Sequence, residues 1–117
     1  MPAARFVRVK GVVQGVGFRP FVYRLAQAHG ISGWVRNSGD GVEIHAEGEE
    51  AALDAFVRDL AAEPPPASRV VSLLVTPAQA DGGDGFEIRD SDAEDRHPTV
   101  RISPDHPGAS VHIVLQP

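Results

Sequence analysis

The stretch at residues 5–30, RFVRVKGVVQGVGFRPFVYRLAQAHG, decides the fold because it holds a strand, a glycine-rich turn and a helix in direct succession. Valines alternate with bulky or basic side chains in its first part, and this two-residue period predicts a strand over residues 5–12. A helical period takes over at residues 18–29, and Gly30 is a natural helix stop. The expected apolar face of this helix consists of Phe18, Phe21, Val22, Leu25 and Ala28.

Further strand and helix patterns follow this unit as far as residue 90. The third predicted strand alternates apolar residues with three polar ones that we expect on its solvent side, Glu43, His45 and Glu47. The expected elements are strands at residues 31–37, 42–47, 69–76 and 86–89, and a helix from Glu49 to the Pro64-Pro65-Pro66 stop. The order βαββαβ with a short final edge predicts an α+β, ferredoxin-like sandwich. Its antiparallel sheet would carry two helices on one face.

The chain has 117 residues, enough for one domain with one core. We expect this domain to occupy residues 1–90, because the regular patterns fail beyond residue 91. Acidic residues and prolines dominate residues 91–117, which predicts a linker or disordered tail. The short apolar run at residues 111–115 leaves open an additional edge strand.

Cysteine is absent from the sequence, which excludes disulfides, thiolate metal sites and a cysteine nucleophile. This composition fits a reducing compartment. No run of 18 apolar residues is present, and residues 1–10 lack the apolar stretch of a secretory signal. We therefore expect a cytoplasmic protein without membrane association.

The net charge of −5 is unevenly distributed along the sequence. Residues 1–48 carry six basic and three acidic side chains, whereas residues 49–117 carry five basic and thirteen acidic ones. Either the first part attracts a small anion, or the difference only reflects an acidic tail. The overall acidity argues against a nucleic acid partner. The five histidines show no paired metal-ligand spacing, so no metal site is expected.

The segment Gln14-Gly15-Val16-Gly17-Phe18-Arg19 joins the first predicted strand to the first helix. Glycines at such a junction let several backbone N–H groups point into one concavity, and the following helix adds its positive end. The guanidinium of Arg19 can bind two oxygens of a phosphate. An ordinary glycine-rich turn is the alternative. The spacing matches neither a Walker loop nor a dinucleotide fingerprint.

Asn37 ends the second predicted strand, just before the turn at residues 38–41. In a βαββαβ sheet this strand end lies near the glycine-rich loop. Its side-chain amide can hold a water by donating and accepting hydrogen bonds. Asparagine also initiates turns, so the residues alone leave both interpretations open.

Two motifs resemble the acylphosphatase family. Residues 11–19, GVVQGVGFR, are similar to the signature Gly-x-Val-Gln-Gly-Val-x-Phe-Arg, and residues 33–42, GWVRNSGDGV, to the second signature, which begins Gly-aromatic-Val-basic-Asn-x-x-x-Gly. The resemblance covers roughly residues 5–90. It implies that the loop from Gln14 to Phe18 and Arg19 bind phosphate, and that Asn37 positions water.

A narrower resemblance links residues 17–26, GFRPFVYRLA, to the N-terminal domain of HypF-type carbamoyltransferases, which mature hydrogenases. In those proteins a Pro-Pro-Asp segment and cysteine-rich modules follow, whereas this sequence has Ser103-Pro104-Asp105 and no cysteine. The resemblance implies a separated domain of that kind or an independent protein of the same lineage. Other hydrogenase maturation domains or proteins are the implied partners.

The predicted function is hydrolysis of acyl phosphates, with carbamoyl phosphate as the expected substrate and without cofactor or metal. One alternative is a free-standing general acylphosphatase, and another is a phosphate-binding docking domain of low activity. An RNA-binding module on the same fold would need aromatic residues on the middle strands, where the sequence has Glu43, His45 and Glu47.

Overall fold

The computed structural model describes residues 2–89 and the backbone of residues 111–114. The helix predicted at residues 18–29 and the strand predicted at residues 86–89 have the expected bounds, and the other elements differ from prediction by one or two residues. The elements are β1 (Ala3–Val12), α1 (Phe18–His29), β2 (Ser32–Ser38), β3 (Gly41–Gly48), α2 (Glu50–Ala62), β4 (Arg69–Ala78), β5 (Phe86–Arg89) and β6 (Val111–Val114).

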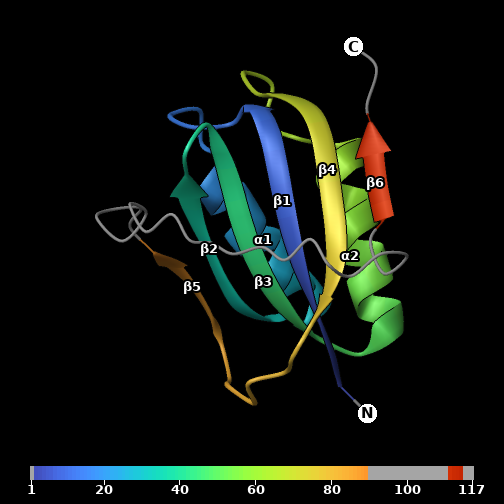
Figure 1. Cartoon of the computed structure of the whole chain (residues 1–117). Coiled ribbons are helices and arrows are strands. Elements are labelled where there is room, and N and C mark those ends of the chain that lie inside the picture. Colours follow the sequence, from blue (N-terminus) through green and yellow to red (C-terminus); the bar gives the residue numbers. More distant parts are fainter. Residues whose placement is uncertain (1, 90–110, 115–117) are drawn as a thin grey trace.

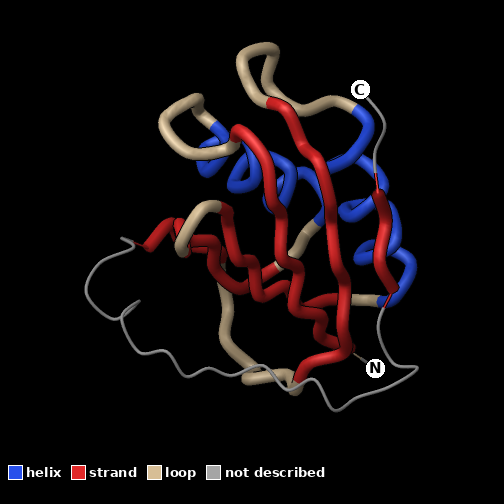
Figure 2. Tube along the Cα trace, turned by 45° about the horizontal axis from the view of Figure 1, so that its top comes forward, coloured by secondary structure: helices blue, strands red, loops and turns tan. Residues whose placement is uncertain are grey.

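The strands form one sheet in the order β5-β2-β3-β1-β4-β6, with β1 paired antiparallel to both β3 and β4. Both helices lie on the same side of this sheet, as the two views show (Figure 1, Figure 2). The predicted ferredoxin-like sandwich is confirmed. The prediction of a wholly antiparallel sheet is wrong at one edge, because β5 pairs parallel with β2. The connection after β4 carries the chain to the far edge of the sheet, so β5 runs in the direction of β2.

The hydrophobic core lies between the helices and the sheet. The helix α1 contributes Phe18, Phe21, Val22 and Ala26, so its predicted apolar face is shifted: Ala26 is buried and Ala28 is exposed. The shift arises because Phe18, Val22 and Ala26 follow one i, i+4 row, which runs along the sheet. Within the described residues, neither helix is long and apolar enough to cross a membrane.

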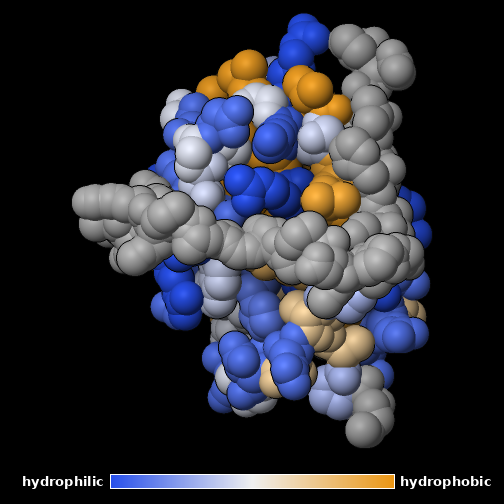
Figure 3. Space-filling view, in the orientation of Figure 1, coloured by the Kyte–Doolittle hydropathy of each residue, from blue (hydrophilic) through white to orange (hydrophobic). Residues whose placement is uncertain are grey.

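The helix-free face of the sheet corrects one prediction. Glu43, His45 and Glu47 point to this face as expected, but they are buried instead of exposed to solvent. The strand β3 lies between β1 and β2, and long neighbouring side chains cover it. Arg8 and Arg36 both pair with Glu43, at 2.8 and 3.0 Å. Hydrophilic side chains gather in the middle of this face (Figure 3). Alternation along a strand indicates which side chains lie on the same face of the sheet, but it does not indicate what covers that face.

The additional edge strand, which the sequence did not decide, is present, since Val111–Val114 pair antiparallel with β4 over Ser72–Val75. The rest of the predicted tail, residues 91–110 and 115–117, lies outside the described residues. The predicted domain boundary near residue 90 therefore stays a prediction.

Truncation after residue 90 should leave a folded domain that is modestly less stable. β4 keeps its long pairing with β1, and the part of the structure described loses a four-residue edge, β6. We expect the free energy of unfolding to fall by about 1–3 kcal/mol, because each backbone hydrogen bond contributes about 1 kcal/mol net. Urea unfolding of residues 1–90 and of the full chain measures this difference. An unfolded truncated protein would show that β6 is integral to the sheet.

Candidate functional site

The glycine-rich loop between β1 and α1 lies at the end of the sheet that also carries the β2–β3 turn (Figure 1). Gly15 and Gly17 have φ angles of 75° and 82°, in the left-handed region that favours glycine. A Cβ atom added at either position would meet nothing within 4 Å. The backbone torsion, and not lack of space, therefore requires glycine here.

The loop presents several free backbone donors. Among the described residues, the backbone N–H groups of residues 14–17 donate no hydrogen bond to another backbone group. The first N–H groups of α1 have no helical acceptor either, and its N-cap, Gly17, provides no side-chain cap. Phe18 contributes only its backbone to this end, because its ring belongs to the core. Free donors at a helix N-terminus form an anion-binding site.

Gln14 connects this loop to the β2–β3 turn. Its side-chain Nε2 donates hydrogen bonds to the carbonyl oxygens of Gly39 and Gly41, each at 2.9 Å. The sequence placed Gln14 in the loop but did not indicate this bridge, because the partners are backbone atoms 25 and 27 residues away. The loop is therefore held beside the strand end that carries Asn37.

The strand β5 holds the guanidinium of Arg19 near the same place. The Nη1 atom of Arg19 donates a hydrogen bond to the carbonyl oxygen of Arg89 at 3.2 Å. Arg89 is the register partner of Arg36 on β2, and Asn37 follows directly. The guanidinium of Arg19, on α1, is thereby held at the end of β5 that lies beside Asn37 on β2, although the two residues are 18 positions apart in the sequence.

Asn37 shares the helix-facing side of β2 with Val35, because side chains alternate along a strand. Its Oδ1 atom is buried, and among the described residues it has no hydrogen-bond partner. A buried acceptor without a donor costs about 1–3 kcal/mol, so such an atom is a candidate for binding a ligand or water.

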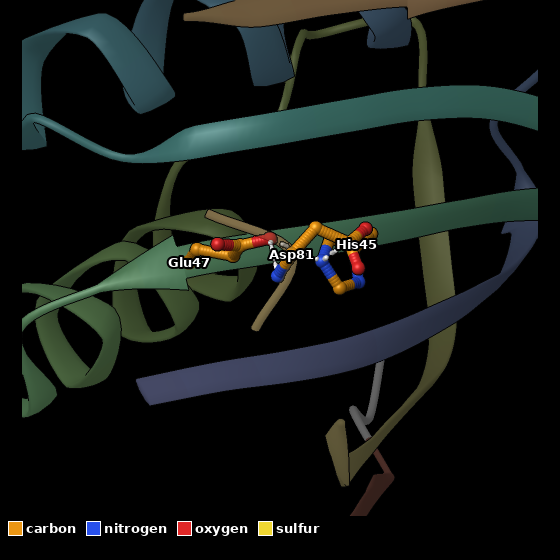
Figure 4. A group of neighbouring side chains, drawn as sticks. All are labelled: His45, Glu47 and Asp81. Carbon is orange, nitrogen blue, oxygen red and sulfur yellow. Dashed lines mark hydrogen bonds and ion pairs between the residues drawn. The ribbon is translucent and has the colours of Figure 1, made fainter. Parts of the chain in front are cut away.

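A second polar cluster lies on the helix-free face, at the opposite end of β3. Glu47 accepts hydrogen bonds from the backbone N–H of Asp81 at 2.7 Å and from His45 at 2.8 Å (Figure 4). It also accepts one from the backbone N–H of Gly82 at 3.1 Å. Burial alone would raise the pKa of the Glu47 carboxyl. The hydrogen bonds from Asp81, His45 and Gly82 outweigh burial and hold this pKa below its ordinary value of 4.5.

This shift predicts an acid-sensitive contribution to stability. Because the pKa of Glu47 is lower in the folded state, its contribution is complete above pH 4.5 and is lost as the pH falls through the folded value. The free energy of unfolding should fall less steeply on acidification in Glu47→Gln than in the wild type. Urea unfolding between neutral and acidic pH measures both slopes, with the exposed Glu63→Gln as control. Equal slopes in all three proteins would contradict the prediction.

Comparison with known proteins assigns the family. The acylphosphatase family model matches residues 5–88. The solved acylphosphatase from Bacillus subtilis is 42% identical, with a TM-score of 0.70, and the match covers 76% of this chain and 99% of that one. The chain therefore belongs to the acylphosphatase family.

Within this family, the chain is also similar to HypF carbamoyltransferases. HypF2 from Cupriavidus necator is 52% identical over 91 residues, which cover 76% of this chain and 11% of that protein. A solved full-length HypF in the phosphate- and nucleotide-bound form has a TM-score of 0.75 at 36% identity, and the match covers 79% of this chain and 12% of that chain. The chain thus spans about a tenth of the length of the HypF proteins that it matches.

Proposed function

We propose that this domain hydrolyses acyl phosphates at the end of the sheet where the glycine-rich loop, Arg19 and Asn37 meet. The observation that carries the proposal is a juxtaposition within residues 2–89: backbone N–H groups at the start of α1 and a buried amide oxygen that have no hydrogen-bond partner in this range, and a guanidinium held by β5. The backbone N–H groups and the guanidinium of Arg19 bind an anion, and the amide oxygen of Asn37 accepts a hydrogen bond from a neutral molecule such as water.

The phosphoryl group of the substrate binds in the loop. The N–H groups of residues 14–18 and the guanidinium of Arg19 donate hydrogen bonds to its oxygens. These donors are fixed before substrate binds, because Gln14 anchors the loop to the β2–β3 turn. Prearranged donors stabilise the charge that redistributes over the phosphoryl oxygens in the transition state.

Asn37 accepts a hydrogen bond from the attacking water and holds it in line with the bond that breaks. The water oxygen bonds to phosphorus, the bond between phosphorus and the acyl oxygen breaks, and a phosphoryl oxygen of the substrate takes the proton. The leaving group is a carboxylate or carbamate, which is stable without protonation. The reaction therefore needs neither a general acid nor a metal ion.

Carbamoyl phosphate is the proposed substrate. The support is the similarity to HypF carbamoyltransferases, together with the resemblance of residues 17–26, which contain Pro20, to the N-terminal domain of those proteins. The carbamoyl group is small and planar, close to acetyl in size. A group of this size offers little surface for discrimination, so acetyl and benzoyl phosphate should be cleaved as well.

Phosphate release from three compounds tests the proposal. With a chelator present, the protein should release phosphate from carbamoyl phosphate and acetyl phosphate, and very little from an alkyl phosphate, because an alkoxide leaves poorly without an acid or a metal. In ¹⁸O-labelled water, the label should enter phosphate. Preferred cleavage of the alkyl phosphate, loss of activity with the chelator, or label in the carboxylate would each refute the mechanism.

A phosphate-binding docking domain is the second candidate, because the HypF relatives are about ten times longer than the matched region. In that case other hydrogenase maturation domains would use the bound phosphate compound. Tight binding of phosphate together with negligible hydrolysis of acetyl phosphate would favour this candidate over the enzyme.

A further inference from the structure

The helix-free face contains a group of metal-ligating side chains that the proposed hydrolysis does not use. His45 and Glu47 lie two residues apart on β3, and Asp81 comes from the loop between β4 and β5 (Figure 4). One ligand atom from each residue lies within 4.8 Å of the others. Histidine spacing predicted no metal site, because Asp81 is 34 positions beyond Glu47 and only the fold brings them together.

We propose that His45, Glu47 and Asp81 bind a divalent transition-metal ion of the Zn²⁺ class. One imidazole nitrogen and two carboxylate oxygens are ligands that Zn²⁺ accepts, and the nitrogen favours such an ion over Mg²⁺ or Ca²⁺. The inference is independent of the proposed hydrolysis, since Gln14 of the glycine-rich loop contacts Gly41 at the start of β3, whereas Glu47 lies near the other end of this strand.

The distances within the cluster suit an ion of this size. The Nε2 atom of His45 lies 2.8 Å from the Oε2 atom of Glu47 and 3.9 Å from the Oδ2 atom of Asp81. Tetrahedral zinc bonds of about 2.0–2.1 Å place ligand atoms roughly 3.3 Å apart, between these two distances. To reach this spacing on binding an ion, mainly the side chain of Asp81 has to move, and it can turn because it is 74% exposed.

Two of the three ligands are held in place before an ion binds. His45 is 8% exposed, and its ring stacks on Trp34 with centroids 5.9 Å apart and an angle of 18° between the planes. Glu47 is 6% exposed, and its Oε1 atom accepts the N–H of Gly82. Its Oε2 atom accepts the N–H of Asp81 at 2.7 Å and the ring N–H of His45 at 2.8 Å. The ion would take the place of the His45 proton on this oxygen, and the two backbone hydrogen bonds would remain as support for the ligand.

The cluster is accessible from solvent. A cavity of about 130 Å³ is lined by all three ligands together with Trp34, Asp84 and Glu87. It leaves room for a water molecule as the fourth ligand. A bound ion would fasten the loop at residues 79–85 to β3, and through this loop the edge strand β5, so we assign it a structural role.

The single tryptophan gives a readout at this site, because its ring stacks on His45. Co²⁺ bound to His45 lies next to the Trp34 ring and should quench its fluorescence, whereas His29, the other histidine whose side chain the structure describes, belongs to α1 on the opposite side of the sheet. We expect saturable quenching with one equivalent, reversed by Zn²⁺. Asp81→Asn should weaken the apparent affinity at least tenfold. Asp84→Asn, in the same loop and cavity wall, is the matched control and should bind as the wild type does.

Thermal unfolding supplies a second measurement, because an ion that binds only the folded state raises its stability. Zn²⁺ should raise the Tm of the wild type and of Asp84→Asn, and of Asp81→Asn much less. The proposal is overturned if Co²⁺ produces no saturable quenching up to ~1 mM, a generous limit for a three-ligand site. It is equally overturned if Asp81→Asn matches the wild type. In either case Glu47 is only a hydrogen-bonded clamp for the loop.

Discussion

Replacing Arg19 with alanine should reduce the hydrolysis of acetyl phosphate by about 10²–10³, the usual effect of removing one donor to transition-state charge. Within the described part of the chain, the guanidinium makes a single hydrogen bond, to the Arg89 carbonyl, and the side chain lies outside the core. The fold should therefore survive. Steady-state kinetics and circular dichroism on the same preparation measure both effects.

Arg24→Ala is the matched control, since Arg24 is an exposed arginine of the same helix. It should hydrolyse acetyl phosphate at the wild-type rate. Arg19→Lys keeps the charge but loses the paired donors, and should recover only part of the activity. A folded Arg19→Ala protein with wild-type activity would show that the phosphate does not bind here.

Replacing Asn37 with alanine should lower kcat by about 10²-fold, because the water loses its alignment. The inhibition constant of inorganic phosphate should change little, since the amide acts on water and not on the anion. Equal losses in phosphate binding and in turnover would show that Asn37 belongs to the anion site instead.

Stability provides a further check on the role of Asn37. Its Oδ1 atom is buried and has no hydrogen-bond partner among residues 2–89, so substitution removes no hydrogen bond that the structure shows at that oxygen. We expect Asn37→Ala to be as stable as the wild type or more stable, a trade of stability for activity that is common at functional sites. A large loss of stability would indicate that Asn37 serves the β2–β3 turn.

Local patterns predicted most of the architecture. The helical spacing from Phe18 to the Gly30 stop predicted α1 with its observed bounds, and strand alternation predicted which side chains of β1 and β3 share a face. The glycine-rich loop was also visible, because the left-handed torsions at Gly15 and Gly17 require a residue type that stands out in the sequence.

Features that depend on contacts between distant segments were not predictable in this way. The parallel pairing of β5 with β2 supplies the carbonyl that holds Arg19, and nothing local to either strand indicates it. The burial of His45 and Glu47 depends on Trp34 from the neighbouring strand and on the loop at residues 79–85. Periodicity reports the direction of a side chain, whereas burial depends on what packs over it.

A phosphate titration followed by two-dimensional ¹H–¹⁵N NMR tests the central claim most directly. Inorganic phosphate should shift the backbone amide signals of residues 14–19 in a saturable way, and the same additions to Arg19→Ala should shift them far less. The amides of Asp81 and Gly82, at the other end of the sheet, should stay unchanged. Saturable shifts confined to the helix-free face, or loop signals that phosphate leaves untouched, would contradict the account.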